Sequence, residues 1–337
     1  MLLDGNQPQS IAHAVNALQR GELVGLPTET VYGLAADACN TDAVAKIFAT
    51  KGRPANHPLI VHVASAEGVR AFAAQVPVFA QRLMATFWPG PLTLILPRQE
   101  GIGAAAAGGQ DSIGLRCPAH PVALALLQAC AAQGMTGLAA PSANLFGRVS
   151  PTTAAHVQSE LGRELLVLDG GACEVGIEST IIDCTRGAPV LLRPGQISRA
   201  QIEVACGMAV LDKDTLQAPT PRASGTLESH YAPRAKVRLM SAQEIVAKLQ
   251  ALGPHANNLG VWSAQRPGAE DGTGTGTGMG AGVVWRVQPK SAEQAAHELF
   301  TVLRDLDARG VQQIWVQQPP DTPEWEGVRD RLQRAAA

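Results

Sequence analysis

The sequence predicts an α/β protein with a mixed sheet, because short apolar strands alternate with helical segments along most of the chain. Polar clusters follow several of these strands, and open α/β sheets bind their ligands at strand ends. The chain has 337 residues, of which 46% are hydrophobic and 17% charged, so two domains with sizeable cores are expected. These three observations predict a globular protein whose ligand site lies where strands end.

Residues 1–210 are expected to form the first and larger domain. Apolar runs predict strands over 23–26, 59–63, 92–96, 113–117, 138–140, 165–168, 179–183 and 190–193. Apolar residues at helical spacing predict helices that begin at Ser10, Thr41, Ser65, Val78, Pro121, Ser150 and Ser198, several of them good N-cap residues. The segment from Gly101 to Asp111 is rich in Gly and Ala, and we expect it to be a mobile loop.

Residues 211–235 contain several prolines and no hydrophobic period, which indicates a linker. Alternation resumes over 236–337, with strands expected at 237–239, 259–262, 283–287 and 314–316 and helices at 241–252, 291–309 and 328–337. This predicts a smaller, Rossmann-like α/β domain with a mostly parallel sheet. The Gly/Thr run 272–278 leads into a strand and contains no Lys, so it is interpreted as a surface loop rather than a nucleotide loop.

Composition excludes several classes of protein. The net charge of −2 argues against a chain-wide nucleic-acid surface, although a local patch remains possible. No apolar run is as long as the ~18–20 residues of a membrane span, and the N-terminus lacks the pattern of a signal peptide. None of the six cysteines forms a Cys-x-x-Cys pair, which disfavours a zinc or dithiol site. We therefore expect a cytoplasmic protein whose cysteines are small buried hydrophobic residues.

The most informative stretch runs from Leu26 to Ala38. Pro27 ends a strand because it has no N–H to donate, and Thr28, Glu29, Thr30 and Tyr32 follow it. Hydroxyls and a carboxylate at this point are suited to the edge of a ligand pocket. An ordinary strand-to-loop turn is the alternative interpretation.

Further cations and hydroxyls stand at other strand ends, namely Lys51, Arg53, Arg116 and Arg193 together with Ser112, Ser142, Asn144, Ser150 and Ser179. Such groups are suited to an anionic ligand that carries a carboxylate and phosphates, since arginine binds both in a bidentate manner. The sequence contains no P-loop, no Gly-x-Ser-x-Gly elbow and no His-Glu-x-x-His motif. Catalysis by positioning and charge stabilisation is therefore favoured over covalent catalysis. Structural ion pairs are the alternative role for each arginine.

Several motifs follow one another along the first domain, namely Pro27-Thr28-Glu29-Thr30-Val31-Tyr32-Gly33-Leu34, Lys51-Gly52-Arg53-Pro54, Trp88-Pro89-Gly90-Pro91-Leu92-Thr93, Arg116-Cys117-Pro118, Ala140-Pro141-Ser142-Ala143-Asn144 and Leu192-Arg193-Pro194-Gly195. Taken in this order, they resemble the YrdC family. His230-Tyr231-Ala232-Pro233 and the residues behind it resemble the long, two-domain form of the threonylcarbamoyl-AMP synthases. The resemblance covers nearly the whole chain and implies a YrdC-like twisted mixed sheet over a concave, somewhat basic face.

The resemblance also implies a reaction, in which L-threonine, bicarbonate and ATP, with Mg²⁺, give threonylcarbamoyl-AMP and pyrophosphate. The product would serve the threonylcarbamoyl modification of adenosine 37 in tRNA, through transfer proteins downstream. By similarity, the threonine site comprises Thr30, His62, Arg116, Ala140 and Ser179. The ATP site comprises Lys51, Arg53, His57, Ser112, Ser142, Asn144, Ser150, Arg193 and Tyr231, with Lys51 and Arg53 as catalytic cations. Tyr231 would fold over the nucleotide as part of a lid; packing between the domains is the alternative. His57 stands where some relatives have Asn.

Two other functions are possible from sequence. The concave face could be an RNA-binding module, against which the net charge and the 4% aromatic content argue. A carbamoyl-transfer enzyme of the hydrogenase-maturation type would need zinc-finger-like parts, for which this chain has no Cys-x-x-Cys.

Overall fold

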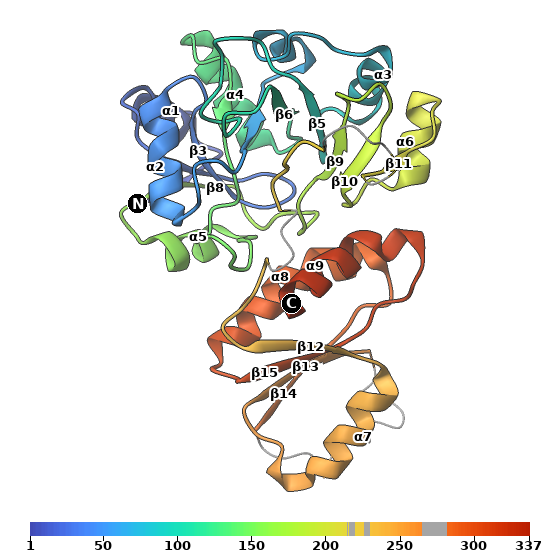
Figure 1. Ribbon diagram of the computed structural model, residues 1–337. Coiled ribbons are helices and arrows are strands. Elements are labelled where there is room, and N and C mark those ends of the chain that lie inside the picture. The colour runs from blue at the N-terminus through green and yellow to red at the C-terminus, as the bar shows by residue number, and fades with distance from the viewer. Residues whose placement is uncertain (214, 216–219, 226–229, 265–281) are drawn as a thin grey trace. The chain divides into compact units, whose positions relative to one another are not determined.

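The structure is a computed structural model that describes every residue except 214, 216–219, 226–229 and 265–281. The chain divides into two compact units (Figure 1). The first unit comprises Met1–Phe146 and Ser150–Thr226, and the second comprises Gly147–Val149 and Leu227–Ala337. The sequence predicted a separate linker over 211–235, whereas the structure divides this segment between the two units. It also assigns three residues from the middle of the first domain to the second unit.

Among its described residues, the first unit contains an eleven-stranded mixed sheet. The strands run in the order β1 (Leu2–Asp4), β8 (Leu166–Asp169), β2 (Val24–Leu26), β3 (Gly33–Asp37), β7 (Leu138–Ala139), β4 (Ile60–His62), β6 (Ser112–Arg116), β5 (Leu92–Pro97), β9 (Thr180–Asp183), β10 (Val190–Arg193) and β11 (Leu211–Asp212). β4 pairs with β6 in parallel and with β7 antiparallel, so sequence-distant strand ends lie side by side.

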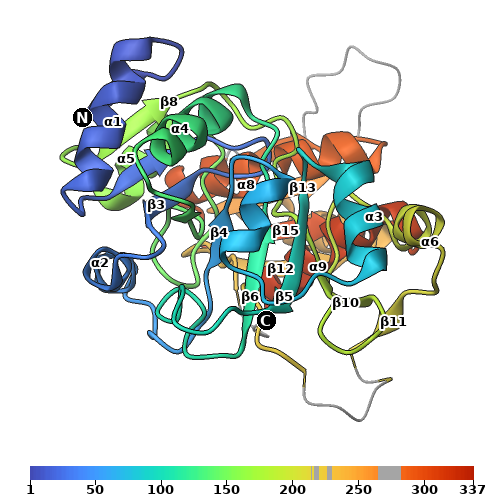
Figure 2. The ribbon, with the colours of Figure 1, turned by 90° about the horizontal axis from the view of Figure 1, so that it is seen from above.

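The helices of the first unit pack in two groups. They are α1 (Pro8–Gln19), α2 (Thr41–Lys51), η1 (Ala66–Ala71), α3 (Val78–Phe87), α4 (Pro121–Ala132), α5 (Ala154–Leu161) and α6 (Arg199–Cys206). Figure 2 shows α1 beside α4 and α3 beside α6, and residues of the two pairs belong to separate hydrophobic clusters. Because successive side chains of a strand point to opposite faces, Leu92, Leu94 and Leu96 join the larger cluster, while Ile95 joins a small cluster with Ile181 and Val190. This small cluster belongs to the sheet face that carries the pocket described below.

Three helices begin elsewhere than predicted. α1 begins at Pro8 rather than after Ser10, since proline suits the first helical position and Ser10 is buried inside the helix. α2 is capped by Asn40, whose side chain accepts from the N–H of Ala43, and Thr41 is its first residue. α5 is capped by Thr153, so Ser150 precedes the helix and lies outside its first turn.

The segment from Gly101 to Asp111 is packed rather than detached. Ala106 and Ala107 are fully buried, and the Ala106 carbonyl accepts from the N–H of Leu59 at 2.7 Å. The predicted surface loop 272–278 lies outside the described residues. No helix among the described residues combines the length and apolar character needed to cross a membrane.

The second unit has a four-stranded, all-parallel sheet within its described residues, in the order β12 (Lys236–Met240), β15 (Gln313–Gln317), β13 (Leu259–Ser263) and β14 (Val283–Val287). Its helices are α7 (Ala242–Leu252), η2 (Gly253–His255), α8 (Ala292–Ala308), η3 (Pro323–Trp325) and α9 (Glu326–Ala336). α7 packs on one face through Ile245 and Leu249, and α8 and α9 lie on the other (Figure 1). The predicted Rossmann-like α/β architecture is confirmed.

Candidate functional site

Arg116, at the end of β6, is the centre of a buried polar cluster. Its Nε donates to the Gly90 carbonyl at 3.2 Å, and its Nη1 donates to Oγ1 of Thr30 at 2.7 Å. Its Nη2 forms an ion pair with Oε1 of Glu29 at 2.5 Å. A guanidinium carries five N–H groups; two of them donate hydrogen bonds and Nη2 has only its ion pair with Glu29, so N–H groups remain for a ligand oxygen. The cluster can therefore hold a carboxylate in a fixed orientation.

His62 lies in β4, the strand beside that of Arg116, and Ala140 directly follows β7 on the other side of β4. His62 is the register partner of Arg116 across β4 and β6, and the N–H of Ala140 donates to the Ile60 carbonyl at 3.0 Å. Burial, assisted by the Arg116 charge, lowers the pKa of His62 from 6.5 to about 3. His62 is consequently a neutral imidazole at pH 7. Of the residues predicted to contact threonine, Thr30 and His62 thus lie next to Arg116, and Ala140 lies across β4 from it.

Ser179 connects the other predicted positions. Its hydroxyl lies 2.7 Å from Oγ1 of Thr93, and Nη2 of Arg193 donates to it at 3.1 Å. Nε and Nη2 of Arg193 also donate to the Ser179 carbonyl, at 3.0 and 2.9 Å. Ser179 was predicted in the threonine site and Arg193 in the ATP site, so the direct contact makes these two predicted sites adjacent.

Lys51 lies at the C-terminal end of α2, where Gly52 adopts a left-handed conformation (φ 61°) that ends the helix. The Lys51 ammonium donates to the carbonyls of Ser142 and Asn144, both at 2.5 Å. Burial lowers the pKa of Lys51 well below its usual value. Ser150, a little further along, donates to Oε1 of Glu178 at 2.5 Å. Lys51 thus anchors the loop that carries the predicted nucleotide-binding residues.

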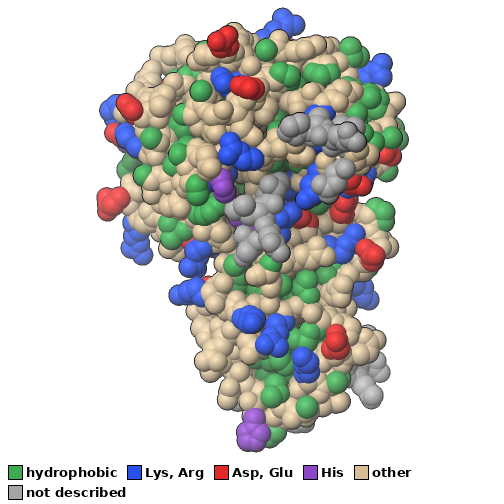
Figure 3. Space-filling view, in the orientation of Figure 1, with side chains coloured by type: hydrophobic (Ala, Val, Ile, Leu, Met, Phe, Trp, Pro, Cys, Tyr) green, Lys and Arg blue, Asp and Glu red, His purple; other side chains and the backbone are tan. Residues whose placement is uncertain are grey.

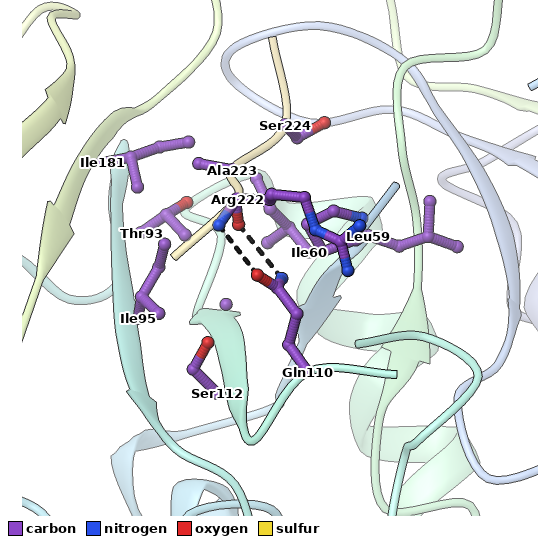
Figure 4. A pocket seen from close by; sticks show the side chains of 12 residues that line it. Leu59, Ile60, Thr93, Ile95, Gln110, Ser112, Ile181, Arg222, Ala223 and Ser224 are labelled. Carbon is purple, nitrogen blue, oxygen red and sulfur yellow. Dashed lines mark hydrogen bonds between the residues drawn. The ribbon is translucent and has the colours of Figure 1, made fainter. Parts of the chain in front are cut away.

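A pocket lies on the sheet face of the small cluster, and the segment Arg222–Ser224 passes beside it (Figure 4). Its lining consists of Pro58, Leu59, Ile60, Thr93, Ile95, Gln110, Ser112, Gly114, Ile181, Arg222, Ala223 and Ser224. The Gln110 side chain exchanges two hydrogen bonds with the backbone of Arg222, at 2.8 and 3.2 Å. Ser112, a predicted ATP residue, faces this pocket together with apolar side chains that could contact a flat ring.

Two of the predicted phosphate-binding arginines contact the same serine of this segment. Nη2 of Arg53 donates to Oγ of Ser224 at 3.3 Å, and Nη1 of Arg193 donates to the Ser224 carbonyl at 2.9 Å. Arg53 also stacks over Phe146, and the ring of His57 meets Phe146 edge-on at 5.4 Å. Burial and the charge of Arg53 lower the pKa of His57. Ser224 therefore already accepts hydrogen bonds from two arginines, Arg53 and Arg193, that an anionic ligand would need.

Tyr231, unlike the other predicted residues, belongs to the second unit. Its ring is 1% exposed and lies 5.3 Å from the ring of Phe300, and the Arg331 guanidinium lies 5.5 Å from its centroid. The structure thus packs Tyr231 into the second unit, and its predicted role as a nucleotide lid remains a prediction.

The site contains residues that the sequence reasoning did not select. Glu178 was not assigned a role, and Glu29 was predicted only as a carboxylate at the edge of a pocket, without its partner Arg116. Ser224 gave no signal, since Ala-Ser-Gly is typical of any tether. Cys117 lies beside Arg116, but burial raises the pKa of its thiol to about 11. This agrees with the absence of a predicted nucleophilic role.

The comparisons with known proteins place this geometry in context. The family model described as "Telomere recombination" matches residues 16–195, and "Threonylcarbamoyl-AMP synthase, C-terminal domain" matches residues 197–337. The chain is 38% identical to the threonylcarbamoyl-AMP synthase of Bacillus subtilis, over 99% of this chain and 94% of that protein. It is 37% identical to the Pyrococcus abyssi synthase, over 96% of this chain and 93% of that protein.

Solved structures are also similar over the whole chain. The P. abyssi Sua5 protein complexed with L-threonine matches with a TM-score of 0.84 and 34% identity, covering 100% of this chain and 97% of that chain. The protein belongs to the threonylcarbamoyl-AMP synthase family, in the two-domain Sua5 form.

Proposed function

We propose that this protein is an L-threonylcarbamoyladenylate synthase, a nucleotidyltransferase that converts L-threonine, bicarbonate and ATP into threonylcarbamoyl-AMP, pyrophosphate and water. The observation that carries the proposal is the full-length similarity to synthases of that name, one of which is solved with L-threonine. The buried Arg116 cluster and the adjoining cations support it, because they are suited to a carboxylate beside phosphates.

The reaction has two bond-forming steps, and neither requires a protein nucleophile. The threonine amine, once deprotonated, attacks bicarbonate and forms a carbamate with loss of water. A carbamate oxygen then attacks the α-phosphorus of ATP, and pyrophosphate leaves. Both steps bring anions together, so the protein contributes orientation and positive charge.

The residues divide this work between them. Arg116 holds the threonine carboxylate with N–H groups that its hydrogen bonds to Gly90 and Thr30 leave over, and Thr30 and Glu29 fix the guanidinium in place. Arg53 and Arg193 bind phosphate oxygens after leaving Ser224. Lys51 keeps the loop of Ser142 and Asn144 in position. The apolar lining around Ser112 receives the adenosine part.

Mg²⁺ enters with ATP and is part of the substrate in this proposal. In the part of the chain that the structure describes, no group of three or more His, Cys, Asp or Glu side chains is arranged to hold a metal. The ion would accordingly be bound by phosphate oxygens and water, which it retains in many ATP sites.

The product serves tRNA modification through transfer proteins downstream. On the one face of the first unit seen in Figure 3, Lys and Arg side chains are interspersed with Asp and Glu side chains. A basic patch or stripe is the usual footprint of nucleic-acid binding, so this face does not favour RNA binding by the chain itself.

The direct test is mass spectrometry of products formed from ATP, bicarbonate and L-threonine by the purified full-length chain. The expected result is threonylcarbamoyl-AMP in a one-to-one ratio with pyrophosphate, dependent on all three substrates. Turnover with carbamoyl phosphate instead of threonine and bicarbonate would favour the carbamoyl-transfer alternative, and salt-dependent RNA binding without turnover would favour an RNA-binding module.

A further inference from the structure

Residues Gly147–Val149 lie in sequence between Asn144 and Ser150 of the first unit, yet they belong to the second unit. There, the N–H of Ala232 donates to the Gly147 carbonyl at 2.9 Å, and Nη2 of Arg304 donates to the Val149 carbonyl. We propose that these contacts form a clamp on Gly147–Val149 that positions Asn144 and Ser150 for ATP, with Arg304 as a positioning residue. The inference rests on the nucleotide site proposed above.

The clamp has two parts that are fixed within the second unit. On one side, Ala232 pairs with Arg148 in a parallel β-bridge and follows directly after Tyr231. The backbone of Tyr231 has a φ of 63°, which is unusual for a bulky residue and is maintained only when the surroundings enforce it. The burial of its ring against Phe300 supplies that enforcement.

On the other side, α8 presents Arg304 and Asp307, which are three positions apart and therefore lie on one helix face. Asp307 accepts from the N–H of Ala235 at 2.9 Å and lies 3.7 Å from Nη2 of Arg148. One helix thus binds both a carbonyl and a side chain of the clamped residues. A tether that only joined two domains would need neither contact.

The residues that flank the clamped segment are fixed inside the first unit. Before it, Lys51 binds the carbonyls of Ser142 and Asn144, and its own carbonyl accepts from the N–H of Phe146 at 2.8 Å. After it, Ser150 donates to Glu178. Release of Gly147–Val149 should therefore disturb Asn144 and Ser150. It should leave Thr30 and Arg116 in place, because they lie on other segments. ATP binding should depend on the clamp, and threonine binding should not.

The test compares Arg304→Met, which removes the guanidinium but keeps an apolar stem, with Arg286→Met as a matched control. Arg286 also pairs with an acidic residue of α8, Asp305, and takes no part in the clamp. Dissociation constants for ATP and for L-threonine are measured by calorimetry on the full-length chain. Because Arg304→Met loses one charged hydrogen bond, we expect it to raise the dissociation constant for ATP about tenfold. The threonine constant, and both constants of Arg286→Met, should stay within about twofold of wild type.

A second and third variant keep the proposal testable if Arg304→Met is poorly folded. Arg304→Lys retains one donor and should restore most of the ATP affinity, whereas Arg148→Ala removes the contact with Asp307 and should weaken ATP binding selectively. Unchanged ATP binding in Arg304→Met, or equal weakening of both ligands, would overturn the clamp alone. A wild-type chain that bound no ATP would remove the proposed nucleotide site and the clamp with it.

Discussion

Arg116 allows the most direct test of how the site selects its amino acid. Its guanidinium is held by Gly90, Thr30 and Glu29, and a lysine ammonium cannot reproduce this planar arrangement. Arg116→Lys should therefore raise the threonine KM by about tenfold or more, because a charged hydrogen bond and its orientation are lost. The ATP KM should change little. Steady-state kinetics with each substrate varied in turn measures the two values, and an equal rise in both would show that Arg116 has only a structural role.

His62 should make the stability of the fold depend on pH. The pKa of His62 is about 3 in the folded chain and 6.5 in the unfolded chain. Between pH 6.5 and pH 3, His62 is therefore protonated in the unfolded chain but not in the folded chain. The unfolding free energy must then fall as the pH drops from 6.5 towards 3. Between pH 7 and pH 5 this one group should cost about 2 kcal/mol.

Urea unfolding of the wild type and His62→Gln at both pH values isolates this contribution. The variant should lose about 2 kcal/mol less than the wild type over the interval. Equal losses in the two proteins would mean that another group, and not His62, takes up the proton.

At the same scale, sequence reasoning selected polar residues at strand ends but did not predict the contacts that they make. Lys51 was predicted as a cation for phosphates, and its motif gave no indication that two backbone carbonyls would hold its ammonium. Those carbonyls belong to residues about ninety positions further along the chain. Such a partner depends on the pairing of distant strands, which local pattern does not specify. The same reason explains why the pairing of Arg116 with Glu29 was not predicted.

At the scale of elements, the apolar periodicity predicted most strands but missed β1, β3 and β11, and it misplaced several helix ends. The strand over 283–287 agrees with β14 residue for residue, because alternation and flanking breaks define a strand locally. The start of α5 was placed at Ser150, where a serine followed by proline resembles a helix start. In the folded chain the Ser150 hydroxyl is bonded to Glu178, and Thr153 caps the helix instead. Ser150, which local rules would use as the cap of α5, is instead engaged in a tertiary contact with Glu178.

The segment Arg222–Ser224 should compete with ATP. Ser224 accepts hydrogen bonds from Arg53 and Arg193, and Gln110 holds the segment through the backbone of Arg222. Gln110→Ala should release it and lower the ATP dissociation constant about threefold, since roughly 0.5–1.5 kcal/mol of holding energy is lost. Stopped-flow binding should show a faster on-rate. If the variant binds ATP more weakly, the segment instead covers the bound nucleotide and contributes to its affinity.

At the scale of the whole molecule, sequence composition predicted two domains but not where one ends. The two units have separate hydrophobic clusters, one around Ile245 and Val261 and others around the large sheet. Periodicity identifies such clusters because each is built from nearby strands and helices. The assignment of Gly147–Val149 to the second unit arises from contacts with Ala232 and Arg304 far along the chain, and no local pattern signals it.

This arrangement predicts how a ligand will affect unfolding of the two units. Four of the five tryptophans, Trp262, Trp285, Trp315 and Trp325, lie in the second unit, so tryptophan fluorescence reports mainly on it, whereas far-UV circular dichroism reports on both. ATP at one hundred times its dissociation constant stabilises the unit that binds it by about 2.7 kcal/mol, which should raise its unfolding midpoint by about 5–10 °C.

If the two units were independent, only the circular dichroism transition would move. Because Gly147–Val149 belong to the second unit while Asn144 and Ser150 contact the nucleotide in the proposed site, we expect ATP to raise the fluorescence midpoint as well. Thermal melts of the wild type and Arg304→Met, each at saturating ATP, measure this coupling. The variant should keep the shift seen by circular dichroism and lose most of the shift seen by fluorescence. If ATP does not change the fluorescence midpoint of the wild type, the second unit unfolds independently of the nucleotide site.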